Sequence, residues 1–413
     1  MGFRIGFLSC LLWLSSPVTA GEVEVLHWWT SGGESKSVEV LKQLMEEQGH
    51  TWKDFSVAGG GGESAMTVLK SRVFSGNPPV AAQIKGPSIQ EWAEEGVLTN
   101  LDTVAARGQW DTLLPTVIKQ AMKHEGHYVG VPVNVHRVNW MWVNPKVFEK
   151  AGAKIPTTWD EFTVAAEQIK KAGYIPVAHG GKPWQEATIF ESIVLGIGGA
   201  DFYRKAFVDL DRKALTSDTM NRAFAILKTI KQYTDKDAPG RDWNLATSMV
   251  INGKAAMQFM GDWAKAEFAN AGKVPGEDYV CVPVPETSGA FIYNVDSFVM
   301  FQQTRKEVQA AQNDLAKIIM EPRFQEVFSL NKGSIPARLN MDMAAFDRYG
   351  VASMNDFLAG SKENTLVPSL AHGMSASASV RGAVCDVVTN FYNSDMQAGE
   401  ASKRLAMEVM AAQ

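Results

Sequence analysis

The chain has 413 residues, 46% of them hydrophobic, and carries 45 acidic against 40 basic residues, for a formal net charge of −5. This size and composition indicate a globular protein with a well-buried core, arranged as two domains or as one large α/β unit. The acidic balance argues against nucleic-acid binding.

Residues 1–20 have the pattern of a cleavable secretory signal. Arg4 precedes an apolar run over residues 5–14, and the tripeptide VTA at 18–20 offers a small-residue cleavage site. Cleavage would leave a mature chain that begins near Gly21 and, without Arg4, holds 39 basic against 45 acidic residues, a net charge of −6. No later stretch supplies the ~20 uninterrupted apolar residues of a membrane span, so we expect a soluble exported protein.

The three cysteines allow more than one interpretation. Cys10 follows Leu8-Ser9, which faintly resembles a lipoprotein box, but it lies too early in the signal for that alternative. Cys281 and Cys385 would remain in the mature chain. An oxidising compartment would allow them to pair, and two separate buried thiols are the alternative; the sequence leaves both open.

Strand-like and amphipathic helical runs alternate in the first part of the mature chain. VEVLHWW precedes a helix predicted over 37–48, FSVAGG precedes one over 64–75, and VAAQIKG precedes one over 88–95. This order predicts a parallel sheet covered by helices, and such sheets bind ligands at the carboxyl ends of their strands. The stretches HWWTSGGE and QIKG both stand at such ends.

Longer extended segments follow. Residues 128–136 and 138–143 have no helix between them and could cross from one domain to another. In a second α/β region, Thr158 as N-cap and Glu161 three residues later predict a capping box at a helix start. Extended segments return at 279–285 and 290–301, and the last third of the chain reads as mostly helical.

Several patterns that suggest other chemistry are incomplete. The glycine run 59–62 precedes a helix but lacks the Gly-Lys-Ser/Thr ending of a phosphate loop, so a tight strand-to-helix turn explains it better. His124 and His127 do not have the spacing of a zinc helix, and Gly126 between them indicates a turn. The G-x-S-x-G nucleophile elbow is absent from the sequence. We therefore expect no cofactor and no metal.

Trp28 and Trp29 stand side by side after a strand predicted over 23–26. Neighbouring side chains on a strand point to opposite faces, so one can pack inward and the other must face something else. Other aromatic and charged residues share this placement near predicted strand ends: Glu34, Lys85, Asp262, Trp263 and Asp296. Tryptophan offers a flat apolar face to the C–H face of a sugar, whereas carboxylates and lysine hydrogen-bond its hydroxyls. We hypothesise that one or both tryptophans face a ligand cleft.

Five stretches resemble the extracellular solute-binding proteins, family 1, of ABC importers, and among these the periplasmic glucose-binding proteins. The stretches are HWWTSGGE, AGGGGESAMTVLKSRVFSGNPPVAAQIKG, YVGVPVNVHRVNWMWVNPKVFEKAGAKIPTTWDEF, GKAAMQFMGDWA and LNKGSIPAR. The resemblance runs over nearly the whole mature chain. It implies an α/β protein with the two-lobe periplasmic binding protein fold (type II-like), a ligand cleft between the lobes and no catalysis. It also implies an ABC permease and ATPase complex in the inner membrane as partners of a monomeric binding protein.

The resemblance further implies a set of sugar-contacting residues, taken over motif by motif. They are Trp28, Trp29 and Glu34 in HWWTSGGE, Gln83 and Lys85 in QIKG, Trp263 in GDW, Asp296 in NVDSF, Lys332 in NKGSIP and His372 in LAHGMS. His136 and Trp243 are expected as rim contacts. Because no extended subsite is recognisable, a monosaccharide is favoured, with glucose as the first candidate. Burying unpaired charges is costly, so closure around these charged groups requires a polyhydroxyl ligand that pairs with them.

The lobes implied by the resemblance are not contiguous in sequence. The N-terminal lobe would comprise residues 21–133 and 290–335, and the C-terminal lobe 134–289 and 336–413. Hinge closure of two such lobes over a ligand is a switching mode of periplasmic binding proteins.

Other functions stay open from the residues alone. A periplasmic glycoside hydrolase could use Glu34, Asp262 and Asp296 as acid and nucleophile or base, with two carboxyl groups roughly 5–5.5 Å apart if retaining or ~6.5–9.5 Å if inverting. A carrier that signals to a chemoreceptor is another alternative, and the ligand could be another hexose or an oligosaccharide.

Overall fold

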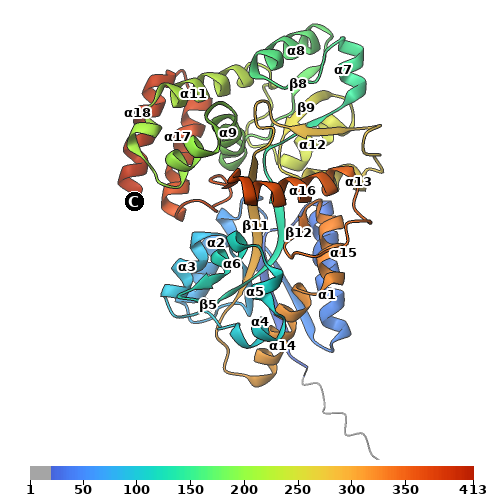
Figure 1. Ribbon diagram of the computed structural model, residues 1–413, viewed down its shortest axis with the longest axis vertical. Coiled ribbons are helices and arrows are strands. Elements are labelled where there is room, and N and C mark those ends of the chain that lie inside the picture. Colours follow the sequence, from blue (N-terminus) through green and yellow to red (C-terminus); the bar gives the residue numbers. More distant parts are fainter. Residues whose placement is uncertain (1–19) are drawn as a thin grey trace, which may run out of the picture.

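The computed structural model describes residues 20–413, so the signal peptide predicted over 1–20 lies outside the described residues except for Ala20. Two α/β lobes stand one above the other in Figure 1, and each is built on its own sheet. No helix within residues 20–413 is both long enough and apolar enough to cross a membrane.

The first lobe, at the bottom of Figure 1, has a seven-stranded sheet with the order β12-β6-β11-β3-β1-β2, and β13 pairs with β11. β1 runs parallel to β2 and β3, whereas β11 is antiparallel to β3 and β6. The carboxyl ends of β1 and β3 therefore meet at one edge, where ligands of such sheets bind. The strands are β1 (Glu22–His27), β2 (Thr51–Ser56), β3 (Ala81–Gln83), β6 (Gly130–Arg137), β11 (Phe291–Met300), β12 (Ile335–Pro336) and β13 (Leu366–Pro368).

Helices of this lobe cover its sheet. They are α1 (Gly32–Glu47), α2 (Glu63–Phe74), α3 (Pro87–Glu94), α4 (Asp102–Arg107), α5 (Trp110–Leu113), α6 (Thr116–Met122), α14 (Lys306–Ile319) and α15 (Pro322–Lys332). A short hairpin of β4 (Lys123–His124) and β5 (His127–Tyr128) follows α6.

The predicted helices over 64–75 and 88–95 correspond to α2 and α3 within one residue at each end. α1 begins five residues before the predicted start, because Ser31 and Glu34 form a capping box that the prediction overlooked.

The second lobe, at the top of Figure 1, has a four-stranded sheet with the order β10-β7-β9-β8. Its strands are β7 (Trp140–Val143), β8 (Ile175–Val177), β9 (Ala255–Phe259) and β10 (Val280–Pro283). Its helices are α7 (Pro145–Ala151), α8 (Trp159–Lys171), α9 (Pro183–Phe207), α10 (Arg212–Leu215), α11 (Asp218–Lys231), α12 (Trp243–Ile251), α13 (Ala264–Asn270), α17 (Ala378–Asn393) and α18 (Ala398–Ala412). The predicted capping box at the start of α8 is confirmed, with both reciprocal hydrogen bonds of Thr158 and Glu161 present.

Strands β6 and β11 lie where the two lobes join (Figure 1). Val135 near the end of β6 belongs to the hydrophobic core of the first lobe, whereas Val138 just beyond it belongs to that of the second. Farther along, Met354 and Phe357 on α16 (Arg348–Glu363) pack into the first core, although they follow the crossing predicted near 336. The lobe boundaries predicted from the sequence thus stay a proposal.

The lobes touch each other on both sides of the space between them. The backbone N–H of Gly33 on α1 donates to Glu267 on α13 at 3.2 Å. On the other side, Arg381 on α17 forms an ion pair with Glu63 at the start of α2. These contacts hold the residues that follow β1 and β3 opposite the second lobe.

Cys281 and Cys385 are both buried and unpaired, so the structure favours the two separate thiols over a disulfide. Burial raises the pKa of Cys385 to about 12, which keeps that thiol protonated.

Candidate ligand-binding site

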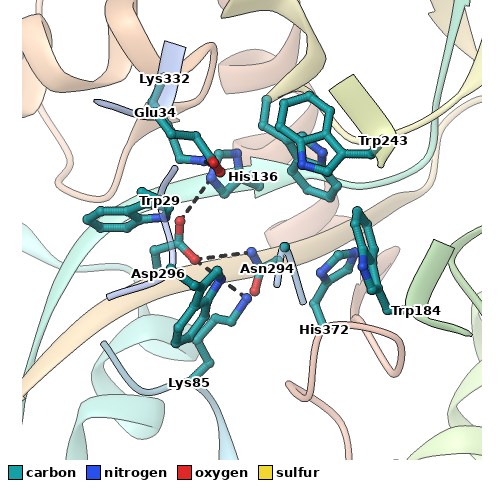
Figure 2. Close-up of a pocket in the computed structure, with 13 residues that line it drawn as sticks. Trp29, Glu34, Lys85, His136, Trp184, Trp243, Asn294, Asp296, Lys332 and His372 are labelled. Atoms are coloured by element: carbon teal, nitrogen blue, oxygen red, sulfur yellow. Dashed lines mark hydrogen bonds and ion pairs between the residues drawn. The ribbon is translucent and has the colours of Figure 1, made fainter. Parts of the chain in front are cut away.

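A pocket of about 300 Å³ lies between the lobes (Figure 2). It is formed where the carboxyl ends of β1 and β3, the joining strands β6 and β11, and the N-terminal ends of three second-lobe helices come together. Its lining residues are Trp28, Trp29, Glu34, Gly60, Lys85, His136, Trp184, Trp243, Trp263, Asn294, Asp296, Lys332 and His372.

Trp28 and Trp29 both reach the pocket, although each also packs against its own lobe. Trp29 makes an edge contact with Phe298 at a centroid distance of 5.5 Å and a tilted one with Phe328 at 5.3 Å. The ammonium group of Lys85 lies 5.1 Å from the ring centroid of Trp28. The chain leaves β1 at this point, so both adjacent side chains can turn to the same side despite the strand alternation expected from the sequence.

Glu34 and Lys332 form an ion pair at the pocket wall. Lys332 Nζ donates to Glu34 Oε1 at 2.8 Å, and Glu34 Oε2 accepts the backbone N–H groups of Thr30 and Ser31, both at 3.1 Å. Lys332 Nζ also lies 5.7 Å from the ring centroid of Trp29. The capping box of α1 thus fixes the carboxylate that holds this ammonium group.

Asp296 on β11 is the centre of a second charged cluster, at the floor of the pocket (Figure 2). Lys85 Nζ lies 3.6 Å from Asp296 Oδ1, and Asp296 Oδ2 lies 3.1 Å from His136 Nε2. The other ring nitrogen of His136, Nδ1, contacts Asp262. Both nitrogens of the imidazole therefore face carboxylates, which is the arrangement of a doubly protonated ring.

Burial and charge set the pKa values in this cluster. Burial alone would lower the pKa of His136, but Asp262 and Asp296 outweigh it and raise that pKa. Burial alone would raise the pKa of Asp296, but Lys85 and His136 lower it well below the usual range. Burial lowers the pKa of Lys85, with Asp296 opposing the shift. Asp296 is therefore an ionised acceptor.

The second lobe contributes an aromatic wall. Trp184 lies at the start of α9, Trp243 is the first residue of α12, and Trp263 is the N-cap of α13. His372, from the loop after β13, lies 4.9 Å from Trp263 and 5.6 Å from Trp184 between ring centroids. Burial, followed by the positive charge of Lys85, lowers the pKa of His372 well below its usual value, so this imidazole is neutral.

The glycine run forms a turn that fits between the tryptophans of the two lobes. Gly60 has φ +65°, and a Cβ there would lie 3.2 Å from the ring of Trp184. Gly62 has φ +90°, and a Cβ there would lie 3.1 Å from the ring of Trp28. Glycine tolerates both the backbone conformation and the close approach.

Among the fully buried polar atoms of the lining residues, two have no hydrogen-bond partner within residues 20–413. They are the indole N–H of Trp184, a donor, and the side-chain oxygen Oδ1 of Asn294, an acceptor. Asn294 uses its Nδ2 group to donate to Asp296 at 3.4 Å. Buried polar groups are normally paired, so these two are available to a ligand that both accepts and donates.

Of the eleven contact and rim residues that the resemblance implies, ten line this pocket. The exception is Gln83, which lies behind the lining, accepts the backbone N–H of Trp28 and donates to Asp296, each at 3.3 Å. The two expected rim residues, His136 and Trp243, are 1% and 4% exposed and belong to the pocket wall. Within residues 20–413, no three His, Cys, Asp or Glu side chains form a metal site.

Three lining residues were not selected from the sequence: Gly60, Trp184 and Asn294. Asn294 stands two positions before Asp296 on one strand, so the strand period would have placed both on the same face. Trp184 comes from a helix start rather than a strand end, and only its position after Pro183 in GKPWQE marked that start.

The family model of the bacterial extracellular solute-binding proteins matches residues 29–313 of this chain. The chain is 49% identical over 390 residues to a protein of Brucella melitensis, named a probable sugar-binding periplasmic protein, with 94% of this chain and 92% of the relative covered. A protein of Rhizobium meliloti with the same name is 48% identical over 393 residues, which cover 95% and 94% of the two chains.

A solved structure with the same fold is a chitin oligosaccharide binding protein. It superposes with a TM-score of 0.81 at 18% identity and covers 95% of this chain and 99% of its own. The predicted two-lobe periplasmic binding protein fold is thereby confirmed. With the family pattern matched over most of its length, the chain belongs to the bacterial extracellular solute-binding proteins.

Proposed function

We propose that this protein binds a monosaccharide, with glucose as the first candidate, by closure of its lobes in the periplasm, and that it delivers the sugar to an ABC permease and ATPase in the inner membrane. The relatives from Brucella melitensis and Rhizobium meliloti, which share nearly half of its residues, are named as sugar-binding and periplasmic. The predicted secretory signal is in keeping with that compartment.

The observation that carries the proposal is the chemistry of the pocket lining. Ionised Asp296 and the unpartnered Asn294 oxygen accept hydrogen bonds, whereas Lys85 and the Trp184 indole donate them. A hydroxyl group does both, so a ring that carries several hydroxyls can pair with these groups at once. The tryptophan faces suit the C–H side of such a ring.

The size of the pocket supports a small ligand. Its volume of about 300 Å³ includes space that is open to solvent, so the room enclosed between the lobes is smaller still. Trp29 lies on one side of the pocket and Trp184 and Trp243 lie on the other (Figure 2), and Trp28 and Trp263 also line it. A monosaccharide is therefore preferred to an oligosaccharide.

The arrangement of the carboxylates supports binding without catalysis. Asp262 is outside the lining and is occupied by His136 and by the backbone N–H of Arg137, which donates at 2.8 Å. Glu34 accepts three hydrogen bonds from its own lobe, and Asp296 is ionised. Neither Glu34 nor Asp296 is thus placed as the protonated acid that a glycoside hydrolase requires.

Calorimetric titration tests the proposal with glucose, galactose, mannose, maltose and an amino acid. We expect tight binding of at least one hexose, weaker binding of maltose and none of the amino acid. The same preparation should release no reducing sugar from disaccharides or aryl glycosides. Sustained turnover that disappears in Glu34→Gln or Asp296→Asn would replace this proposal with the hydrolase, and preference for maltose would replace the monosaccharide.

A further inference from the structure

His372 reaches the pocket at the end of a segment that one buried carboxylate holds. Glu191 on α9 is fully buried and does not line the pocket. Its Oε1 accepts the hydroxyl of Ser369 at 2.7 Å, and its Oε2 accepts the backbone N–H groups of Leu370 at 2.7 Å and Ala371 at 3.2 Å. Three consecutive residues before His372 are therefore tied to a single side chain.

The contact continues from Ser369 to His372 itself. The Ser369 hydroxyl donates its hydrogen bond to Glu191, and its oxygen accepts the backbone N–H of His372 at 3.1 Å. Glu191 thus fixes the main chain of His372 through one intervening hydroxyl.

A kink in α9 completes this arrangement. Tyr203 donates its hydroxyl to Glu191 Oε2 at 2.7 Å, although the two residues are twelve positions apart on the same helix. A straight helix would separate them by about 18 Å along its axis. The kink at Gly199, with φ +74° and ψ 174°, lets the second half of α9 fold back so that Tyr203 reaches the carboxylate.

The imidazole of His372 is held by the same helix. Its Nε2 lies 3.2 Å from the hydroxyl oxygen of Thr188, which donates its own proton to the carbonyl of Trp184 at 2.8 Å. The Thr188 oxygen must therefore accept, so the network assigns the proton of the neutral ring to Nε2. Nδ1 is then a bare acceptor, and within residues 20–413 no hydrogen-bond donor contacts it.

We propose that Glu191 is a positioning residue for ligand binding: it fixes the segment 369–372 so that His372 presents Nδ1 to a ligand hydroxyl. This inference rests on the proposed function, because it assumes a hydroxylated ligand in the pocket. Glu191 would accordingly affect affinity only through His372 and not through a contact of its own.

A double-mutant cycle tests this dependence. Glucose, or the hexose that binds best, is titrated into wild type, His372→Ala, Glu191→Gln and the double variant. Loss of one hydrogen bond weakens binding about threefold to tenfold, and we expect both single variants to fall in this range. In the double variant the affinity should equal that of His372→Ala. Additive losses would show that Glu191 acts elsewhere and would overturn the inference.

Glu186→Gln is the matched control. Glu186 is an equally buried carboxylate on α9, but it accepts from Asn393 at 3.2 Å, away from the segment 369–372. We expect this variant to keep wild-type affinity, and a loss equal to that of Glu191→Gln would indicate a general effect of altering α9. If Glu191→Gln does not fold, Ser369→Ala removes the same link with a smaller change and should reproduce the cycle.

Nitrogen NMR of the histidine ring gives a second readout. In wild type, His372 should show a protonated Nε2 and a bare Nδ1, and Glu191→Gln should shift or broaden these signals. A wild-type ring protonated at Nδ1, or unchanged signals in the variant, would refute the inference. If wild type binds no sugar at all, the proposed function fails instead; if it binds sugar and His372→Ala has no effect, only the present inference fails.

Discussion

The two walls of the pocket differ in how they are stabilised. The first-lobe side and the joining strands carry two ion pairs beside Trp28 and Trp29, with Asp296 contacting Lys85 and Glu34 contacting Lys332. The second-lobe wall carries three tryptophans and a neutral histidine. Ion pairs and hydrogen bonds are directional, whereas ring faces accept any flat apolar surface. The charged wall should therefore decide which sugar binds, and the aromatic wall how tightly any sugar binds.

The walls should first differ in their response to pH. Burial raises the pKa of Glu191, which supports the aromatic wall, to about 7 from an ordinary 4.5, whereas the pKa of Asp296 in the charged wall is lowered. Between pH 4.5 and 7 the folded state binds more protons at Glu191 than the unfolded state, so its contribution to stability falls as pH rises. The Asp296 contribution is instead lost as pH falls below the ordinary carboxyl range.

Chemical denaturation of Glu191→Gln and of wild type from pH 5 to 8 measures how much Glu191 contributes to the pH dependence of the free energy of unfolding. The variant should gain stability relative to wild type as pH rises, by up to about 3 kcal/mol, since one pKa unit corresponds to about 1.4 kcal/mol. His136 and His179, whose pKa values are also shifted, are common to both proteins and have no contact with Glu191, so their contributions cancel in the difference. A difference that stays constant with pH would contradict the prediction.

Removal of the charged contact at Lys85 should give the next largest effect. Lys85→Ala should weaken sugar binding about tenfold to a hundredfold, which corresponds to the 1.5–3 kcal/mol of a charge-assisted hydrogen bond. The fold should survive, because Asp296 keeps its contacts with His136, Asn294 and Gln83. Calorimetry measures the affinity, with exposed Lys53→Ala as control. Unchanged affinity would remove Lys85 from the site.

A pair of variants tests the division between walls directly. Trp263→Ala should weaken glucose, galactose and mannose by similar factors, because stacking does not distinguish the hydroxyl positions. Asp296→Asn should instead reduce the difference between glucose and at least one epimer, because a site that hydrogen-bonds hydroxyls rejects ligands that leave its groups unpaired. Titrations of both variants with all three sugars are needed. If Trp263→Ala changes the ranking and Asp296→Asn does not, the roles are reversed.

The smallest effect is expected at Gly60, where the two lobes meet. Gly60→Ala places a methyl group 3.2 Å from the Trp184 ring and a side chain at φ +65°. The strain should lower the free energy of unfolding by about 1 kcal/mol and weaken all hexoses equally by a small factor. Thermal unfolding and calorimetry check this. A change in sugar ranking would show that the glycine turn contributes to selectivity.

Local sequence patterns predicted much of the fold. The helices α2 and α3 and the capping box at Thr158 follow from hydrophobic periodicity and capping chemistry. The insertion of β11 between β3 and β6 could not be derived in this way, because it pairs residues more than 150 positions apart. The family resemblance implied only that the chain returns to the first lobe near residue 290, and not which strands it joins there.

For the site, too, local sequence patterns predicted some residues, whereas contacts between distant parts of the chain decided the others. Trp28 and Lys85 were selected because they follow strands, and the pocket lies at those strand ends. Trp184 was missed because a helix N-terminus from the opposite lobe carries it. Gln83 was selected by motif, yet its side chain is used by Trp28 and Asp296, which only the three-dimensional contacts reveal.

The charges around the pocket also cancel. Lys85, Lys332 and doubly protonated His136 are matched by Glu34, Asp262 and Asp296, each cation lying against a carboxylate. A neutral molecule can thus enter without bringing or displacing a counterion, and the interior presents little net field for dissolved ions to screen. Capture of such a molecule should be nearly independent of ionic strength, so that the protein works equally well in dilute and in salty surroundings.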